Sequence, residues 1–246
     1  MRNIRLTLSY DGTDFNGWQT QPGFRTVQET LESAIAEIAG ERIRVNASGR
    51  TDTGVHAVGQ VVNFYTNTRH PPDTLLRAIN AHLPPDVVVS EAADVAQAFD
   101  ANRDAKRKLY RYVIHDGPVP NPFLRRYCYQ SRHRLDVPAM RQAAHALRGR
   151  HDFHSFETDW PNRMSSVRTI THLAVNRMAE WIWLDVEADG FLYNMVRAIA
   201  GTLINVGRGY WPAAQVAEIL HAEDRRQAGP TAPAQGLFLM RVIYAE

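Results

Sequence analysis

The order of strand-like and helix-like segments limits the fold of this chain most strongly, because the same order occurs twice. Residues that alternate between apolar and polar predict strands, whereas apolar residues three and four positions apart predict helices. In the first half these patterns predict strands at 4–10, 43–46, 60–66 and 87–90, and helices that begin at Thr26 and Thr74. In the second half they predict strands at 108–115, 167–176, 181–188 and 236–244, and helices at 139–147 and 191–205.

Each half therefore has the order β-α-β-β-α-β, which is that of a ferredoxin-like fold. We expect an α+β protein with mainly antiparallel sheets, helices on one face of each sheet, and a catalytic cleft between the halves. The boundary is expected near residues 99–105, so that residues 1–103 form the N-terminal half and residues 104–246 the C-terminal half. A junction this short and charged favours tightly associated halves over flexibly tethered ones.

Composition limits the class of protein further. The 246 residues, 44% of them hydrophobic, are enough for one large core or two modest ones. Cys128 is the only cysteine, so the chain cannot form an internal disulfide or a cysteine-based zinc site. The N-terminus does not resemble a secretory signal, and the most apolar long segment, 191–206, is interrupted by polar residues and too short to cross a bilayer. We therefore expect a cytoplasmic protein that does not span a membrane.

Positive charge is concentrated in one part of the chain, although the formal net charge is only +2. Residues 101–134 contain nine Arg or Lys, but only Asp104 and Asp116 as acidic residues. Tyrosines are interleaved with these basic residues around Tyr110 and Tyr127. This mixture is typical of surfaces that neutralise phosphates and stack on bases. RNA is therefore a candidate partner, and a solvated basic face without a ligand is the alternative.

The sequence GRTDTG at 49–54 places Asp52 between two predicted strands, with glycines, an arginine and two hydroxyls around it. Such a loop can hold a carboxylate close to a substrate, but it also fits an ordinary turn in which the aspartate bonds to its own backbone. The spacing does not match a phosphate-binding P-loop, which needs a Lys-Ser/Thr after its glycines. Residue types and spacing alone leave both interpretations of Asp52 open.

The longer segment GRTDTGVHA at 49–57 resembles the catalytic loop of the TruA family of tRNA pseudouridine synthases. Further similar motifs are SYDGT at 9–13, GWQ at 17–19, TVQ at 26–28, RKLYRY at 107–112, HDF at 151–153 and FLYNMVR at 191–197. The resemblance therefore covers nearly the whole chain. One departure is FDANR at 99–103, where family members tend to have an arginine directly after the alanine; it concerns the contacts of this segment and leaves the catalytic positions unaffected.

The resemblance implies an isomerase that converts uridine to pseudouridine in tRNA without a metal, a nucleotide or any other cofactor. It implies that Asp52 is the nucleophile, while attack on C6 of the base, attack on C1′ of the ribose and removal of the ribose 2′ proton all stay open as its first step. Tyr110 would stack on the target uracil, and Arg197 would pair with Asp52 and favour its charged form. Considered alone, Tyr110 also fits a half-buried strand residue and Arg197 an ordinary helix arginine.

The resemblance also implies how tRNA is held. Arg50 is expected to lie beside the bases when the target nucleotide leaves the stack, and structural support of its own loop is the alternative. The further phosphate contacts that we expect are Arg103, Lys106, Arg107, Arg125 and Arg126. The implied substrate is the anticodon stem-loop at tRNA positions 38, 39 and 40, and the implied assembly is a homodimer that holds one tRNA across both subunits.

Two other function classes fit parts of the sequence. A noncatalytic RNA-binding protein would share the ferredoxin-like repeats, and a glycoside hydrolase would use Asp52 with a second carboxylate that no sequence feature identifies. His151 and His154 have a spacing that metal ligands on a helix can have, but no third ligand group follows in a recognisable pattern, so we expect no metal site. Trp181 and Trp183 alternate on one predicted strand, which favours a packing role.

Overall fold

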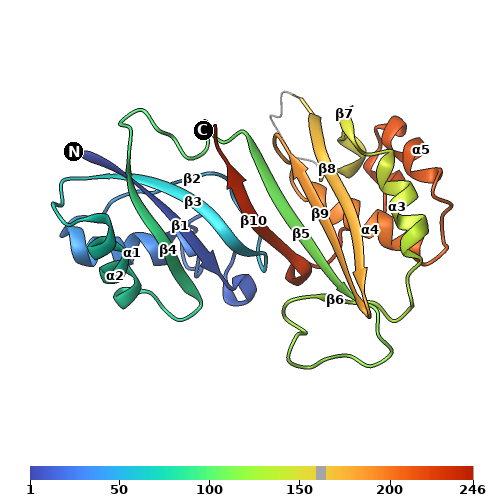
Figure 1. Cartoon of the computed structure of the whole chain (residues 1–246), viewed down its shortest axis with the longest axis horizontal. Helices are drawn as coiled ribbons and strands as arrows, with labels where there is room; N and C mark the ends of the chain where they lie inside the picture. The colour runs from blue at the N-terminus through green and yellow to red at the C-terminus, as the bar shows by residue number, and fades with distance from the viewer. Residues whose placement is uncertain (159–164, 246) are drawn as a thin grey trace. The chain divides into compact units, whose positions relative to one another are not determined.

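The computed structural model describes residues 1–158 and 165–245, and the chain divides into two compact units (Figure 1). Unit 1 consists of Met1–Lys106 and Phe238–Glu246, and unit 2 consists of Arg107–Leu237. Strand pairing is mostly antiparallel, and helices accompany the strands of both units. The expected α+β class is therefore confirmed. Within the described residues, no helix has the length and apolar character needed to cross a membrane.

Unit 1 has the element order β-α-β-β-α-β, and the last strand of the chain joins it. Its elements are β1 (Arg2–Tyr10), α1 (Val27–Ala39), β2 (Asn46–Ala47), β3 (His56–Thr66), α2 (Pro72–His82), β4 (Val87–Val95) and β10 (Leu237–Ile243). β1 pairs antiparallel with β3 on one side and with β4 on the other, and β2 pairs antiparallel with β3. β10 pairs with β3 in parallel.

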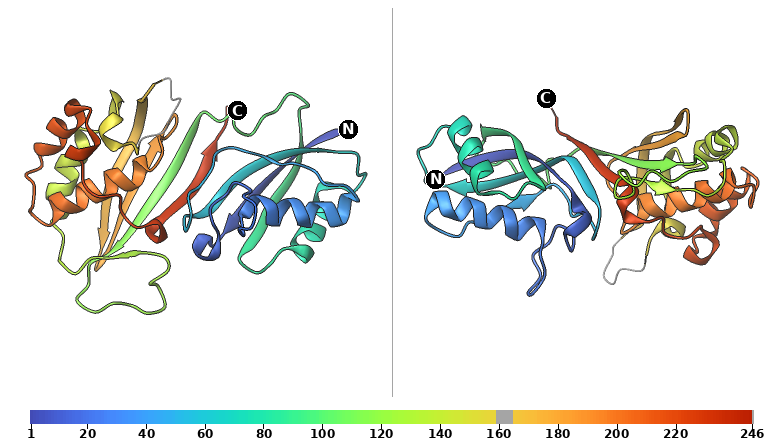
Figure 2. Two further views of the ribbon diagram at one scale, coloured as in Figure 1. Left: turned by 180° about the vertical axis from the view of Figure 1, so that it is seen from behind. Right: turned by 90° about the horizontal axis from the view of Figure 1, so that it is seen from below.

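Alternation along β1 gives unit 1 its core. Ile4, Leu6 and Leu8 are fully buried, whereas the residues between them are only half-buried. Helix α1 begins where the sequence predicts, because the side chain of Thr26 accepts a hydrogen bond from the N–H of Glu29. In the left view of Figure 2, α1 lies in front of the strands of this unit, and α2 packs against β4 and α1. The apolar face of the sheet therefore packs under the two helices.

The strands of unit 2 also pair mainly antiparallel. Its elements are β5 (Arg107–His115), β6 (Tyr129–Gln130), α3 (Val137–His145), β7 (Gly149–Asp152), β8 (Val167–Met178), β9 (Trp181–Ala188), α4 (Met195–Gly207) and α5 (Gln215–Ala222). β9 pairs with β5 and β8, β7 pairs with β8, and the short β6 runs parallel to β5. Helix α4 is buried along most of its length. Short 3-10 turns occur at Gly12–Asp14, His154–Phe156, Arg225–Gln227 and Ala234–Gly236.

The structure differs from the sequence-based expectations at several elements. The sequence order places the last strand in the second half, 104–246, whereas Phe238–Glu246 belong to unit 1, where β10 bonds to β3. The helix predicted from residue 191 begins at Met195, because Asn194 has a φ of 61° in the left-handed region. The strand predicted at 43–46 is reduced to β2, and the sequence patterns do not predict β6, β7 or α5.

Candidate active site

Asp52 lies in the connection between β2 and β3 of unit 1, residues 48–55, named the Asp52 loop. Thr51 and Val55 are buried, Asp52 is half-buried and Arg50 is exposed. The N–H of Val55 donates to the carbonyl of Asp52 at 3.1 Å, and Gly54 between them has a φ of 77°. A tight turn therefore follows Asp52 directly, and Asp52 stays partly accessible between the buried Thr51 and the exposed Thr53.

The segment before α1 supports the Asp52 loop through the main chain. The N–H of Trp18 donates to the carbonyl of Thr51 at 3.0 Å. The first N–H groups of α1 have no partner within the helix; those of Val27 and Gln28 donate to the carbonyls of Gly17 and Trp18 at 3.2 and 3.0 Å. The residue before Asp52 is thus tied through two hydrogen bonds to the start of a helix.

His56 fixes the end of the Asp52 loop where β3 begins. Its buried Nδ1 accepts a hydrogen bond from the N–H of Gly12 at 3.0 Å, and its ring stacks on Phe238 with centroids 4.7 Å apart. A Cβ atom on Gly12 would lie only 2.0 Å from the carbonyl oxygen of Val55. The motifs at 9–13, 17–19, 26–28 and 49–57, which are far apart in the sequence, therefore contact one another around Asp52.

Tyr110 lies on β5 of unit 2, opposite Val186 of β9. Its side chain is 8% exposed, and its ring meets the ring of Phe191 edge-on, with centroids 5.0 Å apart and planes 83° apart. Edge-to-face packing of this kind holds an aromatic ring in one orientation. Because Phe191 starts the segment that leads to Arg197, Tyr110 contacts the same short motif that carries the arginine.

Arg197 lies in the first turn of α4 and is half-buried. Its Nε donates to the carbonyl of Ala232 at 2.7 Å, and its Nη1 donates to Oδ1 of Asn194 at 2.9 Å. The N–H of Ala232 donates back to the carbonyl of Arg197 at 3.0 Å. These contacts orient the guanidinium group, and its pairing with Asp52 stays a prediction.

The residues expected to contact phosphates are exposed, and several of them have protein partners. They are Arg103 and Lys106 in unit 1 and Arg107, Arg125 and Arg126 in unit 2. Arg107 pairs with Glu187 at 2.8 Å, and Arg103 and Arg125 donate to main-chain carbonyls at 3.0 and 2.6 Å. Part of the basic surplus is thus neutralised within the protein, and contact with RNA stays a prediction for each of these residues.

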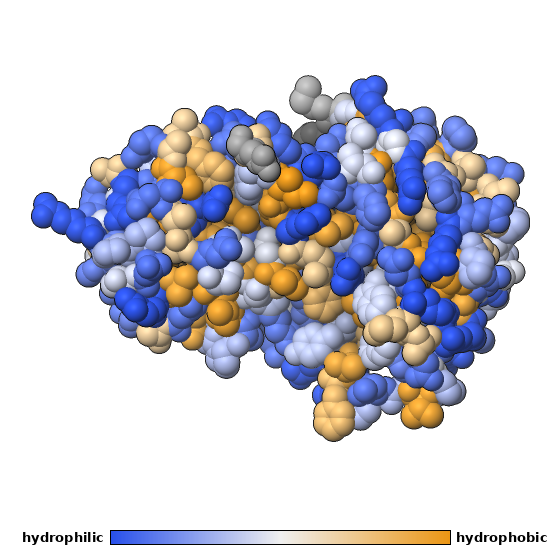
Figure 3. Space-filling view, in the orientation of Figure 1, coloured by the Kyte–Doolittle hydropathy of each residue, from blue (hydrophilic) through white to orange (hydrophobic). Residues whose placement is uncertain are grey.

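The loop between β5 and β6, residues 116–128, is a feature that the sequence patterns do not single out. Val119 is 74% exposed and Phe123 is 85% exposed, and Figure 3 shows hydrophobic side chains at the tip of this loop. Its base is fixed, since Nε2 of Gln130 donates to the carbonyl of Gly117 at 3.0 Å. Exposed apolar side chains on an anchored loop are typical of a contact surface. The sequence feature that could have indicated this loop is PVPNP at 118–122, because its prolines stiffen the chain.

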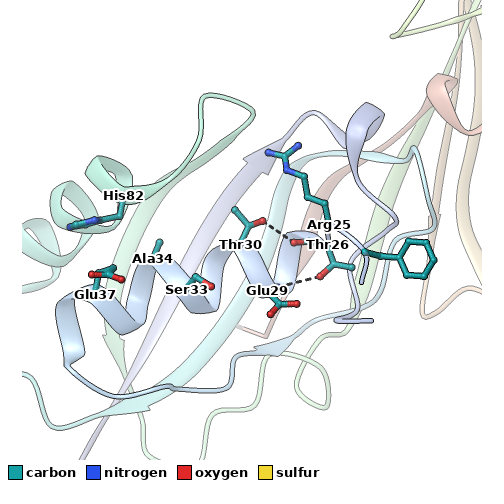
Figure 4. A pocket seen from close by; sticks show the side chains of 9 residues that line it. Arg25, Thr26, Glu29, Thr30, Ser33, Ala34, Glu37 and His82 are labelled. Carbon is teal, nitrogen blue, oxygen red and sulfur yellow. Dashed lines mark hydrogen bonds between the residues drawn. The ribbon is translucent and has the colours of Figure 1, made fainter. Parts of the chain in front are cut away.

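The described residues contain no group of three or more His, Cys, Asp or Glu that could hold a metal ion. His151 lies on β7 and His154 in the following 3-10 turn, so the two do not share a helical face. Figure 4 shows a hollow along α1, lined among others by Thr26, Glu29 and, from the end of α2, His82. None of the residues predicted to act on a substrate lines this hollow.

Comparison with known proteins identifies similar chains over the full length. The sequence profile of a family described as tRNA pseudouridine synthase matches residues 7–102 and 143–245, so that the Asp52 loop and Arg197 lie inside the matched ranges and Tyr110 between them. The chain is 44% identical over 244 residues to tRNA pseudouridine synthase A of Thermoanaerobacter sp., covering 99% of this chain and 100% of that protein. It is 47% identical over 247 positions to tRNA pseudouridine synthase A of Shouchella clausii, with coverages of 100% and 95%. For the protein of that name from Halalkalibacterium halodurans, the identity is 48% over 238 residues, with coverages of 96% and 90%.

Proposed function

Because this chain belongs to the tRNA pseudouridine synthase A family, we propose that it modifies positions 38, 39 and 40 of the tRNA anticodon stem-loop, with Asp52 as its nucleophile. The family itself makes the chain an isomerase that forms pseudouridine in tRNA. The observation that carries the role of Asp52 is a half-buried carboxylate that directly follows the buried Thr51 and directly precedes a tight turn closed by the N–H of Val55. A carboxylate held in this way is already oriented for attack, so little ordering is needed during the reaction.

The proposed reaction rearranges one nucleoside without an outside reagent. The bond between N1 of uracil and C1′ of ribose breaks, the base rotates, and a bond forms between C5 and C1′. The proton on C5 is released and N1 gains a proton, so atoms and electrons balance. Asp52 either adds to C6 or C1′ or removes the 2′ proton, and it is regenerated in each case.

Tyr110 and Arg197 supply the other catalytic roles in the proposal. The edge-on contact with Phe191 supports a stacking role for Tyr110, because it fixes the plane of the ring that would face the uracil. Two acceptors orient Arg197, which supports its proposed pairing with Asp52 and the charged form of that carboxylate. The proposal includes the ferredoxin-like halves and the shared cleft expected from the sequence, because all three side chains must reach one uridine.

The remaining basic residues hold the substrate in the proposal. Arg50 is exposed two positions before Asp52 and would occupy the space that the target base leaves in the stem. The exposed basic residues at 103, 106, 107, 125 and 126 would bind phosphates away from the reacting base. A protein that binds and modifies tRNA in this way would act in the cytoplasm.

The homodimer is also part of the proposal. The exposure of Val119 and Phe123 on the β5–β6 loop supports it, because large apolar side chains on an anchored loop lose contact with water when a second copy covers them. A shared tRNA would then contact basic residues of both subunits.

Release of tritium from C5 tests the reaction and the nucleophile together. The substrate is a tRNA transcript labelled with tritium at C5 of its uridines, and transcripts that keep a uridine at only one of positions 38, 39 and 40 test the site. We expect the protein to release tritium and leave the chain uncleaved. Asp52→Asn should bind the transcript normally and release no tritium above background, because the amide cannot act as a nucleophile or base.

The matched control is Asp94→Asn, which changes an exposed carboxylate of unit 1 that pairs with Arg2. This variant should release tritium at the normal rate. Normal release by folded Asp52→Asn would exclude Asp52 as the nucleophile. Binding without release by the unmodified protein would indicate a noncatalytic RNA-binding protein, and loss of the base from the chain would indicate a hydrolase.

A further inference from the structure

The buried face of the β1–β3 pair changes from apolar to polar at the end nearest the Asp52 loop. On this face Leu6 lies opposite Val62, and both are fully buried. The next pair is Leu8 with Gln60, and Tyr10 follows at the end of β1. Gln60 is fully buried and Tyr10 nearly so. A buried amide or hydroxyl lowers stability unless it is hydrogen-bonded, so the partners of these two groups indicate why they are there.

Gln60 bonds to the first two residues of the Asp52 loop. Its Oε1 accepts a hydrogen bond from Oγ of Ser48 at 2.7 Å, and its Nε2 donates to the carbonyl of Gly49 at 2.9 Å. The N–H of the fully buried Ser48 also donates to the carbonyl of Val61 at 2.8 Å. The amide of Gln60 thus fixes the point where the chain leaves β2 for the Asp52 loop.

Tyr10 bonds to the residue directly before Asp52. Its hydroxyl and Oγ1 of Thr51 are 2.8 Å apart, and its ring packs against Trp18 with centroids 6.1 Å apart. Trp18 in turn donates from its N–H to the carbonyl of Thr51. Burial raises the pKa of Tyr10 to about 12, so its hydroxyl is neutral at physiological pH and serves as a hydrogen-bond partner.

We infer that Tyr10 and Gln60 are positioning residues that set the direction of the Asp52 carboxylate by holding Thr51 and Ser48–Gly49 from beneath the loop. The inference rests on the proposed role of Asp52. Neither side chain is exposed enough to touch tRNA, so both act through the loop residues to which they bond. Phe at position 10 and Met at position 60 would pack equally well, because they are similar in shape to Tyr and Gln. They would lack these hydrogen bonds.

Single-turnover kinetics of Tyr10→Phe and Gln60→Met test the inference. We expect the rate of tritium release to fall by about 10-fold to 100-fold in each variant, because a carboxylate displaced by ~1 Å loses its alignment with the substrate. The dissociation constant for the tRNA transcript should stay unchanged. Amide hydrogen exchange at Thr53 and Gly54 should become faster, since the loop loses a fixed point.

A double-mutant cycle separates the effect of the hydrogen bond between Tyr10 and Thr51 from the effect of general packing. Thr51→Val removes the other partner, so Tyr10→Phe with Thr51→Val should lose no more rate than the worse single variant. The control is Tyr65→Phe, on the far part of β3, which removes a hydroxyl bond of 2.8 Å to the carbonyl of Gln97. This variant should keep the normal rate and the normal exchange at Thr53.

The results distinguish failure of the inference from failure of the proposed function, provided that Asp52→Asn is measured beside the other variants. Normal release by Asp52→Asn would refute the proposed function. Inactive Asp52→Asn with a normal rate in Tyr10→Phe and Gln60→Met would refute only the positioning inference. A rate loss that equals the unfolded fraction measured by thermal denaturation would also refute it, because the two residues would then serve stability alone.

Discussion

At the scale of single residues, Asp116 fixes the start of the β5–β6 loop. Its side chain is fully buried and accepts hydrogen bonds from Arg177 at 2.6 and 3.0 Å, from Arg134 at 3.0 Å and from the N–H of Leu135 at 2.9 Å. Burial acts to raise the pKa of Asp116, but the hydrogen bonds from Arg177 and Leu135 and the two positive charges outweigh it. The pKa therefore lies below its ordinary value.

We expect Asp116→Asn to lower the free energy of unfolding by about 3 kcal/mol at neutral pH, because it leaves arginine charge without its buried partner. A carboxyl group whose pKa is lower in the folded state stabilises the protein above the unfolded pKa, and this contribution is lost as pH falls through the folded pKa. The difference between the variant and the unmodified protein should therefore shrink below about pH 4. Urea denaturation over a series of pH values measures this difference in the free energy of unfolding. A difference that stays constant into strong acid would contradict this explanation.

At the scale of elements, the contact between the segment before α1 and the Asp52 loop needs glycine at position 17. Gly17 has a φ of 81°, and a Cβ atom there would lie 2.9 Å from the carbonyl oxygen of Thr51. Gly23 has nearly the same φ, 80°, but no atom lies within 4 Å of the position of its Cβ. The two glycines therefore share the backbone conformation and differ in the contact.

The pair Gly17→Ala and Gly23→Ala separates these two effects. Each should lose about 1–2 kcal/mol of stability from the left-handed conformation. Gly17→Ala should lose more and should also lower the turnover rate, because its methyl group pushes the main chain beside Asp52. Thermal denaturation and tritium release measure the two quantities. Equal rates in both variants would show that the approach of Gly17 to Thr51 does not affect the carboxylate.

At the scale of the whole molecule, the chain leaves unit 1 at residue 106 and returns to it at residue 238. Unit 1 is therefore complete only when β10 has joined β3, after all of unit 2 has been made. The proposed reaction also depends on the whole chain, since it uses Asp52 from unit 1 and Tyr110 and Arg197 from unit 2.

The proposed homodimer is tested at the same scale by sedimentation equilibrium. We expect the unmodified protein to have twice the mass of one chain and Phe123→Ser to dissociate at higher protein concentrations, because the variant buries less apolar surface. Met178→Ser is the control, since Met178 is 63% exposed in unit 2 outside the β5–β6 loop. A monomeric unmodified protein would exclude the homodimer, and equal behaviour of the two variants would exclude the loop as its interface.

Local patterns in the sequence determined the α+β class, most strands and helices, and the start of α1 at Thr26, because alternation and helix capping depend on residues a few positions apart. The motifs also determined the family and identified Asp52, Tyr110 and Arg197 as candidate catalytic residues. Their assignment came from resemblance, since an aspartate between glycines is physically compatible with an ordinary turn.

Only the tertiary structure decided that β10 belongs to unit 1 and that Tyr10 and Gln60 lie against the Asp52 loop. In the sequence, Tyr10 looks like one more residue of an alternating strand and Gln60 like a polar residue in another. Their hydrogen bonds join residues 41 and 11 positions apart. Such contacts form only when the whole unit folds, because their free energy depends on burial and distance, which no local pattern contains.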